Sequence, residues 1–392
     1  EVVGPSVELL SDIFEKNEFA QESIIVQLQD GTAKITSPSN AKVVNTARNR
    51  GYEDFKTAVD AAEPGDTIKL MSDIQLETRI DIAGKTLTLD LNNHKLSTVD
   101  VVGDETNKSV FAPSVLNITQ NADVTIEGPG TIQSGKTTNS SKSSSNPTIK
   151  ASNIVNLTIQ NCTIIGGEAV NSRYAGDAIE FNSAGTLTLN NVTAAGGDNV
   201  KDPNAPKGNY TNQGNAGSAI KRALTENATV NITGSTLKGG DGLNNGYDPN
   251  TGLESLANGG AAITNNYAST FNITDSYVKG GNSALYNAGN AITANYGTFT
   301  IENCTVEGGD AQTEKAGNGR GIGGDGISVG TSTMTIVSST ITGGDGGDSQ
   351  LGCGIKYNNT DGILNISDSI ISGGGVTGSG TGFGNAIYAG TT

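Results

Sequence analysis

One phrase, an alternating strand that ends in two glycines, recurs seven times between residue 157 and residue 374. The copies are LTIQNCTIIGG (157–167), LTLNNVTAAGG (187–197), VNITGSTLKGG (230–240), FNITDSYVKGG (271–281), FTIENCTVEGG (299–309), MTIVSSTITGG (334–344) and LNISDSIISGG (364–374). Successive copies are 28 to 43 residues apart. A constant strand phrase separated by loops of variable length is typical of a solenoid, in which each repeat stacks on the next.

A second short strand with one recurring isoleucine follows each glycine pair. These segments are GDAIEF (176–181), GSAIKR (217–222), GAAITN (260–265), GNAITA (289–294), GDGISV (324–329), GCGIKY (352–357) and GNAIYA (384–389). Stacking like on like predicts one inward column of these isoleucines and a second column at the third position of the phrase, from Ile159 to Ile366. Asn161, Asn191, Asp275, Asn303 and Asp368 stand where the phrase turns, a position suited to left-handed backbone. The sequence therefore predicts an all-β parallel β-helix.

The first part of the chain has a different pattern. We expect residues 1–50 to be an N-terminal extension with a helix over 6–19 and a hairpin over 24–36, turning at Asp30-Gly31. An amphipathic helix is predicted over 52–62. The β-helix is expected over 51–392, with its first coils in 66–135 and regular repeats in 149–392. The Ser-rich stretch 136–147 is expected to be a flexible external loop.

Several motifs resemble the start of right-handed β-helix proteins of the pectate-lyase-like superfamily, above all secreted and surface-exposed prokaryotic members. They are the helical segment at 52–62, GDTIKL (65–70), TLTLDLNNHKLS (86–97) and VTIEGPGTI (124–132). The resemblance covers roughly 52–392 and implies a right-handed, single-stranded solenoid whose N-terminal end is closed by the short helix. Its motifs specify a fold and not an activity, since lyases, hydrolases, phage tailspikes and non-catalytic adhesins share the superfamily.

Composition excludes several classes of function. The net charge of −16 and the absence of a Lys/Arg cluster argue against a nucleic-acid partner. No apolar run approaches the roughly 20 residues that a membrane span needs. Three cysteines are too few for a disulfide framework, so Cys162, Cys304 and Cys353 are expected to be small buried hydrophobes. A chain that begins at Glu1 fits a mature secreted protein, and we expect a secreted or cell-surface location.

The enzymes of that superfamily carry recognisable catalytic motifs. The NTD, DD, GHG and RIK motifs of polygalacturonase-like members do not occur, and the single histidine, His94, is expected to be a surface turn residue. Arg173, Arg222 and Arg320 are scattered, without the carboxylate cluster of a calcium-dependent lyase. Glu302 and Glu307 share a phrase but are expected on different faces. The remaining candidates for stacking on a sugar, with loop packing as the alternative, are Tyr174, Tyr210, Tyr247 and Tyr267.

Two kinds of accessory site are predicted from single residue types. Asp198, Asp241, Asp310 and Asp345 each follow a glycine pair, so a stack of them can bind Ca²⁺, although turn-forming aspartate is the favoured interpretation. No other cofactor is expected. Asn139 and Asn209 are candidate N-glycosylation sites, because each lies in an N-x-S/T triplet of an expected loop.

A column that starts at Thr158 and Thr188 resembles the ladders of ice-binding solenoids. Its companion is the column from Gln160 to Ser367, which contains Glu302 and Val337, so an ordinary β-face is the favoured interpretation. The leading hypothesis is a non-catalytic extracellular structural or adhesin-like protein that self-assembles into a layer or filament through its N-terminal segment and open C-terminal edge. It would contact surface glycans or proteins through the loops at 136–147, 198–216, 241–259 and 310–323. The alternative is a lyase or hydrolase of acidic polysaccharides; a phage spike is disfavoured because no trimerisation segment is visible.

Overall fold

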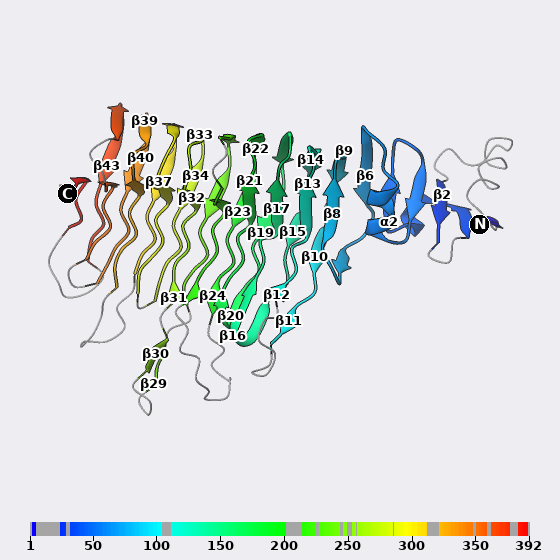
Figure 1. Cartoon of the computed structure of the whole chain (residues 1–392), viewed down its shortest axis with the longest axis horizontal. Helices are drawn as coiled ribbons and strands as arrows, with labels where there is room; N and C mark the ends of the chain where they lie inside the picture. The colour runs from blue at the N-terminus through cyan, green and yellow to red at the C-terminus, as the bar shows by residue number, and fades with distance from the viewer. Residues whose placement is uncertain are drawn as a thin grey trace.

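The chain forms a right-handed parallel β-helix whose axis runs along the longest dimension of the molecule (Figure 1). The structure is a computed structural model. It describes residues 2–4, 24–28, 32–103, 111–200, 214–224, 227–243, 246–248, 253–255, 257–284, 286–311, 321–347, 350–358, 362–376 and 383–390. Among these residues, no helix has the length and hydrophobicity that crossing a membrane requires.

Three long sheets, here called A, B and C, line the β-helix, and each regular coil contributes one strand to each. Sheet A contains β6 (Asp66–Leu70), β9 (Thr86–Asp90), β14 (Asp123–Glu127), β18 (Asn156–Gln160), β22 (Thr186–Asn190), β27 (Thr229–Thr233), β33 (Thr270–Thr274), β36 (Thr298–Glu302), β39 (Thr333–Val337) and β42 (Ile363–Ser367). Sheet B contains β7 (Ile74–Leu76), β10 (Lys95–Thr98), β15 (Thr131–Gln133), β19 (Thr163–Ile165), β23 (Thr193–Ala195), β28 (Thr236–Lys238), β34 (Tyr277–Lys279), β37 (Thr305–Glu307), β40 (Thr340–Thr342) and β43 (Ile370–Ser372). Sheet C contains β8 (Ile80–Ala83), β13 (Leu116–Thr119), β17 (Ile149–Ser152), β21 (Ile179–Asn182), β26 (Ile220–Arg222), β32 (Ile263–Asn265), β35 (Ile292–Ala294), β38 (Ile327–Val329), β41 (Ile355–Tyr357) and β44 (Ile387–Ala389).

Each copy of the repeated phrase spans two strands that meet at one left-handed residue. In the first copy the chain passes from β18 to β19 at Asn161, whose φ is 55°. The same conformation occurs at Asn191, Asp275, Asn303 and Asp368, as predicted. In the third copy Gly234 takes this place with a φ of 57°, where the missing Cβ removes the steric cost. This single turn rotates the chain from sheet A to sheet B.

The predicted inward columns are confirmed by the strand register. Ile179, Ile220 and Ile263 pair in succession in sheet C, and the column continues through Ile292, Ile327 and Ile355 to Ile387. The members up to Ile355 are fully buried. Cys162, Cys304 and Cys353 are buried free thiols, as expected. Burial of such columns over many coils is the main source of stability in a solenoid.

The N-terminal extension continues sheet A beyond the regular coils. β2 (Ile24–Gln27) and β3 (Ala33–Thr36) form the predicted antiparallel hairpin, and β1 (Val2–Gly4) pairs with β3. The sequence analysis missed β4 (Val43–Asn45) and β5 (Arg50–Tyr52), which connect this hairpin to β6. A short 3₁₀ helix, η1 (Pro38–Asn40), precedes β4. The helix expected over 6–19 lies outside the described residues.

The capping helix is shorter than predicted: α2 spans Phe55–Asp60, whereas a helix over 52–62 was expected. It starts late because Tyr52 belongs to β5 and because Asp54 is the N-cap, its side chain accepting a 2.8 Å hydrogen bond from the Thr57 N–H. Its Phe55, Ala58 and Val59 side chains are buried in the same core cluster as the first coils. The helix therefore covers one end of the apolar interior.

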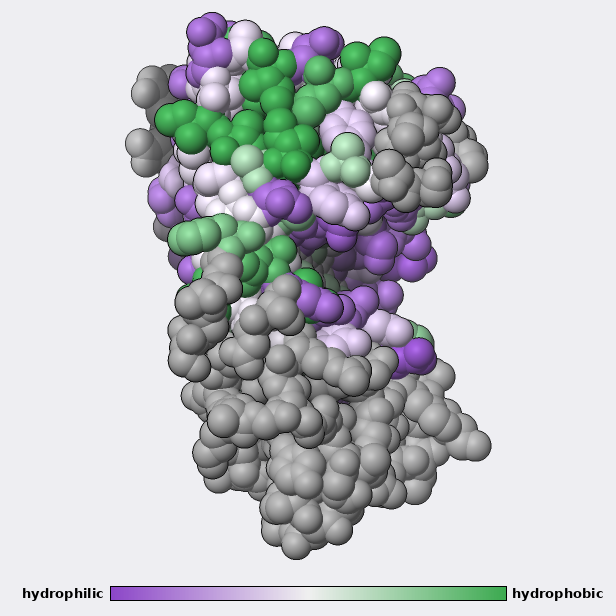
Figure 2. Space-filling view, turned by 90° about the vertical axis from the view of Figure 1, so that its left-hand side faces the viewer, coloured by the Kyte–Doolittle hydropathy of each residue, from purple (hydrophilic) through white to green (hydrophobic). Residues whose placement is uncertain are grey.

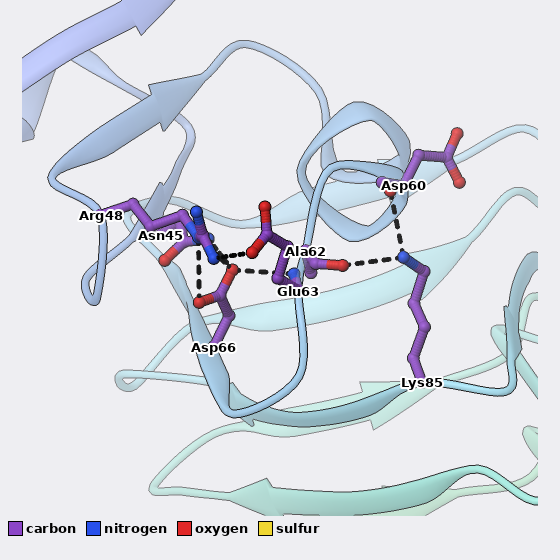
Figure 3. Close-up of polar contacts among 7 residues, drawn as sticks. All are labelled: Asn45, Arg48, Asp60, Ala62, Glu63, Asp66 and Lys85. Carbon is purple, nitrogen blue, oxygen red and sulfur yellow. Dashed lines mark hydrogen bonds and ion pairs between the residues drawn. The ribbon is translucent and has the colours of Figure 1, made fainter.

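A polar network ties α2 to the coil beneath it (Figure 3). Lys85 Nζ donates to the carbonyls of Asp60 and Ala62 at 3.0 and 2.9 Å, where the helix ends. Asp66 accepts from Asn45 Nδ2 at 2.7 Å, from Arg48 Nε at 2.9 Å and from the Glu63 N–H at 2.9 Å. These bonds fix the position at which the chain leaves the helix and enters β6.

The prediction of a flexible loop at 136–147 was wrong. The backbone of β16 (Thr137–Ser145) is an extended strand that pairs in parallel with β20 (Ala169–Tyr174) and with β11 (Val101–Val102) and β12 (Phe111–Ala112). Serine-rich segments are typical of linkers, but here the neighbouring coils supply backbone partners on both sides of the strand. Strand pairing at this position overrides local propensity.

Candidate functional site

The variable loops all leave the β-helix between sheet B and sheet C, so they gather along one edge of the molecule (Figure 1). Besides β16 and β20, this loop flank contains β24 (Asn199–Val200), β25 (Gly214–Asn215), β29 (Gly246–Asp248), β30 (Leu253–Ser255) and β31 (Ala257–Asn258). β25 pairs with its counterpart β31 in the adjacent coil, and β24 pairs with β20, whereas β29 and β30 form an antiparallel hairpin within one loop. The placement of the loops along one side agrees with the expectation from the sequence.

A continuous seam of glycines separates the loop flank from the core. The Gly217 N–H donates to the Gly197 carbonyl at 2.8 Å, and the Gly240 N–H donates to the Gly217 carbonyl at 2.9 Å. The series alternates between two positions that recur in each coil, the second glycine of the glycine pair and the glycine that begins the segment leading into sheet C. It runs through Gly167, Gly176, Gly197, Gly217, Gly240, Gly260, Gly281, Gly289, Gly309, Gly324, Gly344, Gly352, Gly374 and Gly384.

Close backbone approach explains why these positions are glycine. A Cβ on Gly217 would lie 2.0 Å from the Gly176 carbonyl oxygen, and one on Gly240 would lie 2.0 Å from that of Gly197. No side chain fits at such a separation. The chain thus leaves for a loop and returns from it at adjacent points, so loop length changes without altering the coil. This accounts for the variable spacing of the repeat.

The four predicted aspartates stand in one column next to this seam. Asp198 Oδ1 accepts the Asp241 N–H at 2.7 Å, and Asp310 Oδ1 accepts the Asp345 N–H at 2.9 Å. Asn282 stands between them, accepting from the Asp310 N–H at 2.9 Å while its own N–H donates to Asp241 Oδ1 at 2.8 Å. Because an amide serves as well as a carboxylate, the column requires an oxygen acceptor and does not require a charge.

The second carboxylate oxygens of Asp241 and Asp310 face cations of the protein. Asp241 Oδ2 lies 2.8 Å from Lys238 Nζ, and Asp310 Oδ2 lies 3.5 Å from Lys279 Nζ. Burial raises the pKa of Asp198, although the Asp241 N–H opposes this effect. Within the described residues, no group of three or more Cys, His, Asp and Glu side chains is arranged to hold a metal ion. Calcium binding at these aspartates stays a prediction.

A second group of charges lies on the outer side of sheet C, beside the loop flank. Asp177 Oδ1 accepts the Ser218 N–H at 2.7 Å, and its Oδ2 lies 3.2 Å from Lys221 Nζ. Lys150, which belongs to the preceding coil, has its Nζ 3.4 Å from Oε1 of Glu180, which follows Asp177 in the same coil. Towards the C-terminus the arrangement recurs, with Lys356 Nζ at 4.0 Å from Asp325 Oδ2. The face therefore carries paired charges of both signs.

The electrostatics of this face bear on its chemistry. The negative charge of Asp177 raises the pKa of Lys221, while burial raises the pKa of Asp177 against the opposing effect of Lys221 and the Ser218 N–H. A lyase that used Lys221 to remove a proton from a uronic acid would need this lysine in its unprotonated form. Glu180, which could supply a carboxylate, is engaged by Lys150 and by Asn182 Nδ2 at 2.9 Å.

The sequence analysis missed a polar cluster of Tyr277, Lys279 and Glu307 on sheet B. Tyr277 Oη donates to Glu307 Oε2 at 2.6 Å, and Lys279 Nζ lies 3.8 Å from the same oxygen. Burial, followed by the bond to Glu307, raises the pKa of Tyr277 well above its ordinary value, so the phenol stays protonated. One signal in the sequence indicates it: Tyr277 stands between Thr236 and Thr305 in a column that holds threonine in most coils.

The other candidates do not come together. His94 lies near the N-terminal end with Nδ1 at 3.4 Å from Asp73 Oδ1. Arg173 stacks on Tyr174 in the loop flank, whereas Arg222 is fully buried in the interior, donating to the carbonyls of Phe181 and Ser183. Glu302 and Glu307 lie on sheets A and B, which confirms that they face different directions.

Several predicted residues fall where no side chain is described. Arg320, Tyr210 and Asn209 lie outside the described residues, and of Tyr247 only the backbone, in β29, is described. Asn139 lies in β16, so its expected loop setting was wrong. The carbonyl oxygen of Tyr267 accepts from Asn265 Nδ2 at 2.8 Å near sheet C, away from Tyr174. Among the described side chains, these tyrosines form no common stacking surface.

Comparisons with known proteins identify no relative by sequence. No protein-family model matches the chain, and no curated protein matches it. Among solved structures it is similar to the Siphovirus 9NA tailspike receptor binding domain, with 10% sequence identity and a TM-score of 0.16 over 86% of this chain and 75% of that one. The strand pairing described above is what defines the fold.

Proposed function

We propose that the chain is a non-catalytic extracellular β-helix protein of structural or adhesin-like type, related to the pectate-lyase-like superfamily, whose loop flank and adjoining sheet C contact surface glycans or proteins. The pairing of charges on sheet C is the observation that carries the proposal. Asp177 and Lys221 neutralise each other, as do Glu180 and Lys150. Such a face can exchange hydrogen bonds with a polar ligand without supplying a free base or acid.

The alternative, a lyase or hydrolase of acidic polysaccharides, would use the same face. The test is to incubate the purified chain with pectin, polygalacturonate and alginate and to measure unsaturated product by ultraviolet absorbance and new reducing ends by colorimetry. We expect no turnover. Turnover that disappears in Asp177→Asn or Lys221→Ala, but persists in the control Lys356→Ala, would show that the chain is an enzyme.

Binding is tested in parallel, with the same three variants. A glycan array and a cell-binding assay should show retention of the wild-type chain, with weaker binding when the central pair is changed by Lys221→Ala. The Lys356→Ala variant, changed at a distant coil of the same sheet, is the matched control. Equal binding by all variants and by a chain lacking the β29–β30 loop would exclude the loop flank as the contact region.

Self-association forms a second part of the proposal. In the last coil Ile363, Ile370 and Phe383 are 56%, 67% and 89% exposed, and they contribute to an apolar end surface (Figure 2). The edge strands β42, β43 and β44 border this surface. At the opposite end, sheet A reaches the edge strand β1. We propose that a second copy of the chain covers the C-terminal end by extending these sheets, which would give a filament or layer at the cell surface.

A further inference from the structure

The outer face of sheet A carries two columns of threonine and asparagine that were not recognised together in the sequence. Five successive strands each contribute one residue to each column. The rows are Thr186 and Thr188, Thr229 and Asn231, Thr270 and Asn272, Thr298 and Thr300, and Thr333 and Thr335. The first column lies one residue before the repeated phrase, so a phrase that starts at its first apolar residue does not include it.

Strand alternation directs both columns outward. The residue between the two members of each row is Leu187, Val230, Phe271, Phe299 or Met334, and all five are fully buried. Their neighbours on either side therefore point away from the core. All ten outward residues are half-exposed or exposed. None carries a charge, in contrast to the Lys and Glu side chains on the outer face of sheet C.

The array is rigid for identifiable reasons. Phe271 and Phe299 stack beneath it with ring centroids 4.6 Å apart, which supports its centre. Asn272 Nδ2 donates to Asn231 Oδ1 at 2.9 Å, which fixes the orientation of both amides. Threonine is branched at Cβ, so its methyl and hydroxyl groups have few rotamers. The hydroxyl, amide and methyl groups thus occupy fixed positions.

Sheet geometry sets the repeat distances of the array. Neighbouring strands are ~4.8 Å apart, and outward residues of one strand are ~6.7 Å apart. Water molecules joined tetrahedrally by O···O hydrogen bonds of ~2.75 Å have second neighbours ~4.5 Å apart and a layer repeat of ~7.3 Å, by simple trigonometry. The two lattices differ by less than about a tenth in each direction. The ten residues of the two columns are uncharged, Glu302 lies beside them as the third outward residue of β36, and the spacing of the columns matches that of crystalline water.

We propose that the outer face of sheet A between β22 and β39 binds ice. The threonine and asparagine groups order a layer of water with the periodicity of the crystal, and the methyl groups exclude water that would be oriented otherwise. The face is separate from the loop flank, since the loops leave between sheets B and C. The activity goes beyond the proposed function and does not depend on it.

The test uses the full chain and two single substitutions. Ice-affinity partitioning, thermal hysteresis and inhibition of recrystallisation should all be positive for the wild-type chain. Thr298→Lys places a charge in the centre of the array and should abolish enrichment in ice. Thr305→Lys makes the same change on the outer face of sheet B and should retain it. Circular dichroism melting shows whether both variants are folded.

Three outcomes would overturn the proposal. They are partitioning of the wild-type chain into ice no better than that of albumin, equal loss in the two variants while both are folded, and binding to crystalline cellulose or chitin without enrichment in ice. If Thr298→Lys fails to fold, the test uses Thr300→Val instead. This substitution keeps the shape of the side chain but removes its hydroxyl group. It should reduce thermal hysteresis several-fold.

Discussion

At the scale of single residues, the glycine seam imposes the tightest steric constraint described. A side chain at Gly217 would overlap the Gly176 carbonyl, and both backbones belong to paired coils that cannot separate independently. We therefore expect Gly217→Ala to lower the free energy of unfolding by about 1–3 kcal/mol or more, as overpacking does elsewhere. Urea denaturation followed by circular dichroism measures it. Gly390→Ala, where the nearest atoms are at 3.5 Å, is the control and should be close to neutral.

Asp66 is a second residue with a measurable role. Burial alone would raise the pKa of its carboxyl group, but the hydrogen bonds from the Glu63 N–H, Asn45 and Arg48 outweigh burial and hold the pKa below its ordinary value of 3.8. A group whose pKa is lowered by folding stabilises the folded chain above its unfolded pKa, and this stability is lost as pH falls through the folded pKa.

Asp66→Asn should therefore cost about 1–3 kcal/mol of unfolding free energy at pH 6, because the buried donors lose a charged acceptor. The difference from the wild-type chain should shrink as the pH is lowered from 4 towards 2. Thermal melts across this range measure it. Asp60→Asn changes an exposed carboxylate that pairs with Lys56 on the helix surface, and it should leave the pH profile unchanged. A constant Asp66→Asn difference over the whole range would contradict the argument.

At the scale of secondary-structure elements, the ladder of aspartates shows how neighbouring coils are held in register. Asp241 Oδ1 accepts a hydrogen bond from the Asn282 N–H, and Asn282 itself has the same role for Asp310. Asp241→Asn should leave stability nearly unchanged, while Asp241→Ala should cost about 1–2 kcal/mol because a backbone donor loses its partner. Denaturant titration distinguishes the two. Equal destabilisation by both would mean that the charge matters, through the ion pair with Lys238 or through a bound cation.

Calcium provides an independent measurement on the same column. If Asp198, Asp241, Asp310 and Asp345 bind Ca²⁺, the melting temperature of the chain should rise with millimolar CaCl₂ and fall after chelation. We expect no change larger than that caused by an equal ionic strength of NaCl, because each of the four aspartates accepts a backbone N–H and two of them, Asp241 and Asp310, also face lysines. A calcium-specific rise that Asp241→Asn removes would support the site.

How far the elements could be read from the sequence depends on what determines them. The isoleucine columns and the turn at Asn161 follow from residue type, because apolar period and left-handed preference are local properties. β16 could not be read in this way, since its pairing with β20 depends on the neighbouring coil. The Lys221–Asp177 pair was missed for the same reason, as it joins residues of different repeats. Likewise, no periodicity signals that Asn282 completes a column of aspartates.

At the scale of the whole molecule, the proposed self-association depends on the C-terminal end surface. Ile370→Lys and Phe383→Lys each place a charge on that surface and should shift the protein from assemblies to monomers in sedimentation velocity and light scattering. Tyr296→Lys also replaces an exposed apolar residue, but one in an earlier coil, so it serves as the control. Unchanged assembly in the two end variants, or no assembly of the wild-type chain at micromolar concentration, would rule out this interface.

The glycine seam also has a practical consequence for protein engineering. The two ends of each loop meet at the glycine seam of the β-helix, and the loops of successive coils leave it ~4.8 Å apart. A guest peptide whose own termini are close together can therefore be grafted into any of these positions without disturbing the β-helix. Several guests in consecutive turns would form a linear display with ångström-scale pitch, and the β-helix would serve as a molecular ruler.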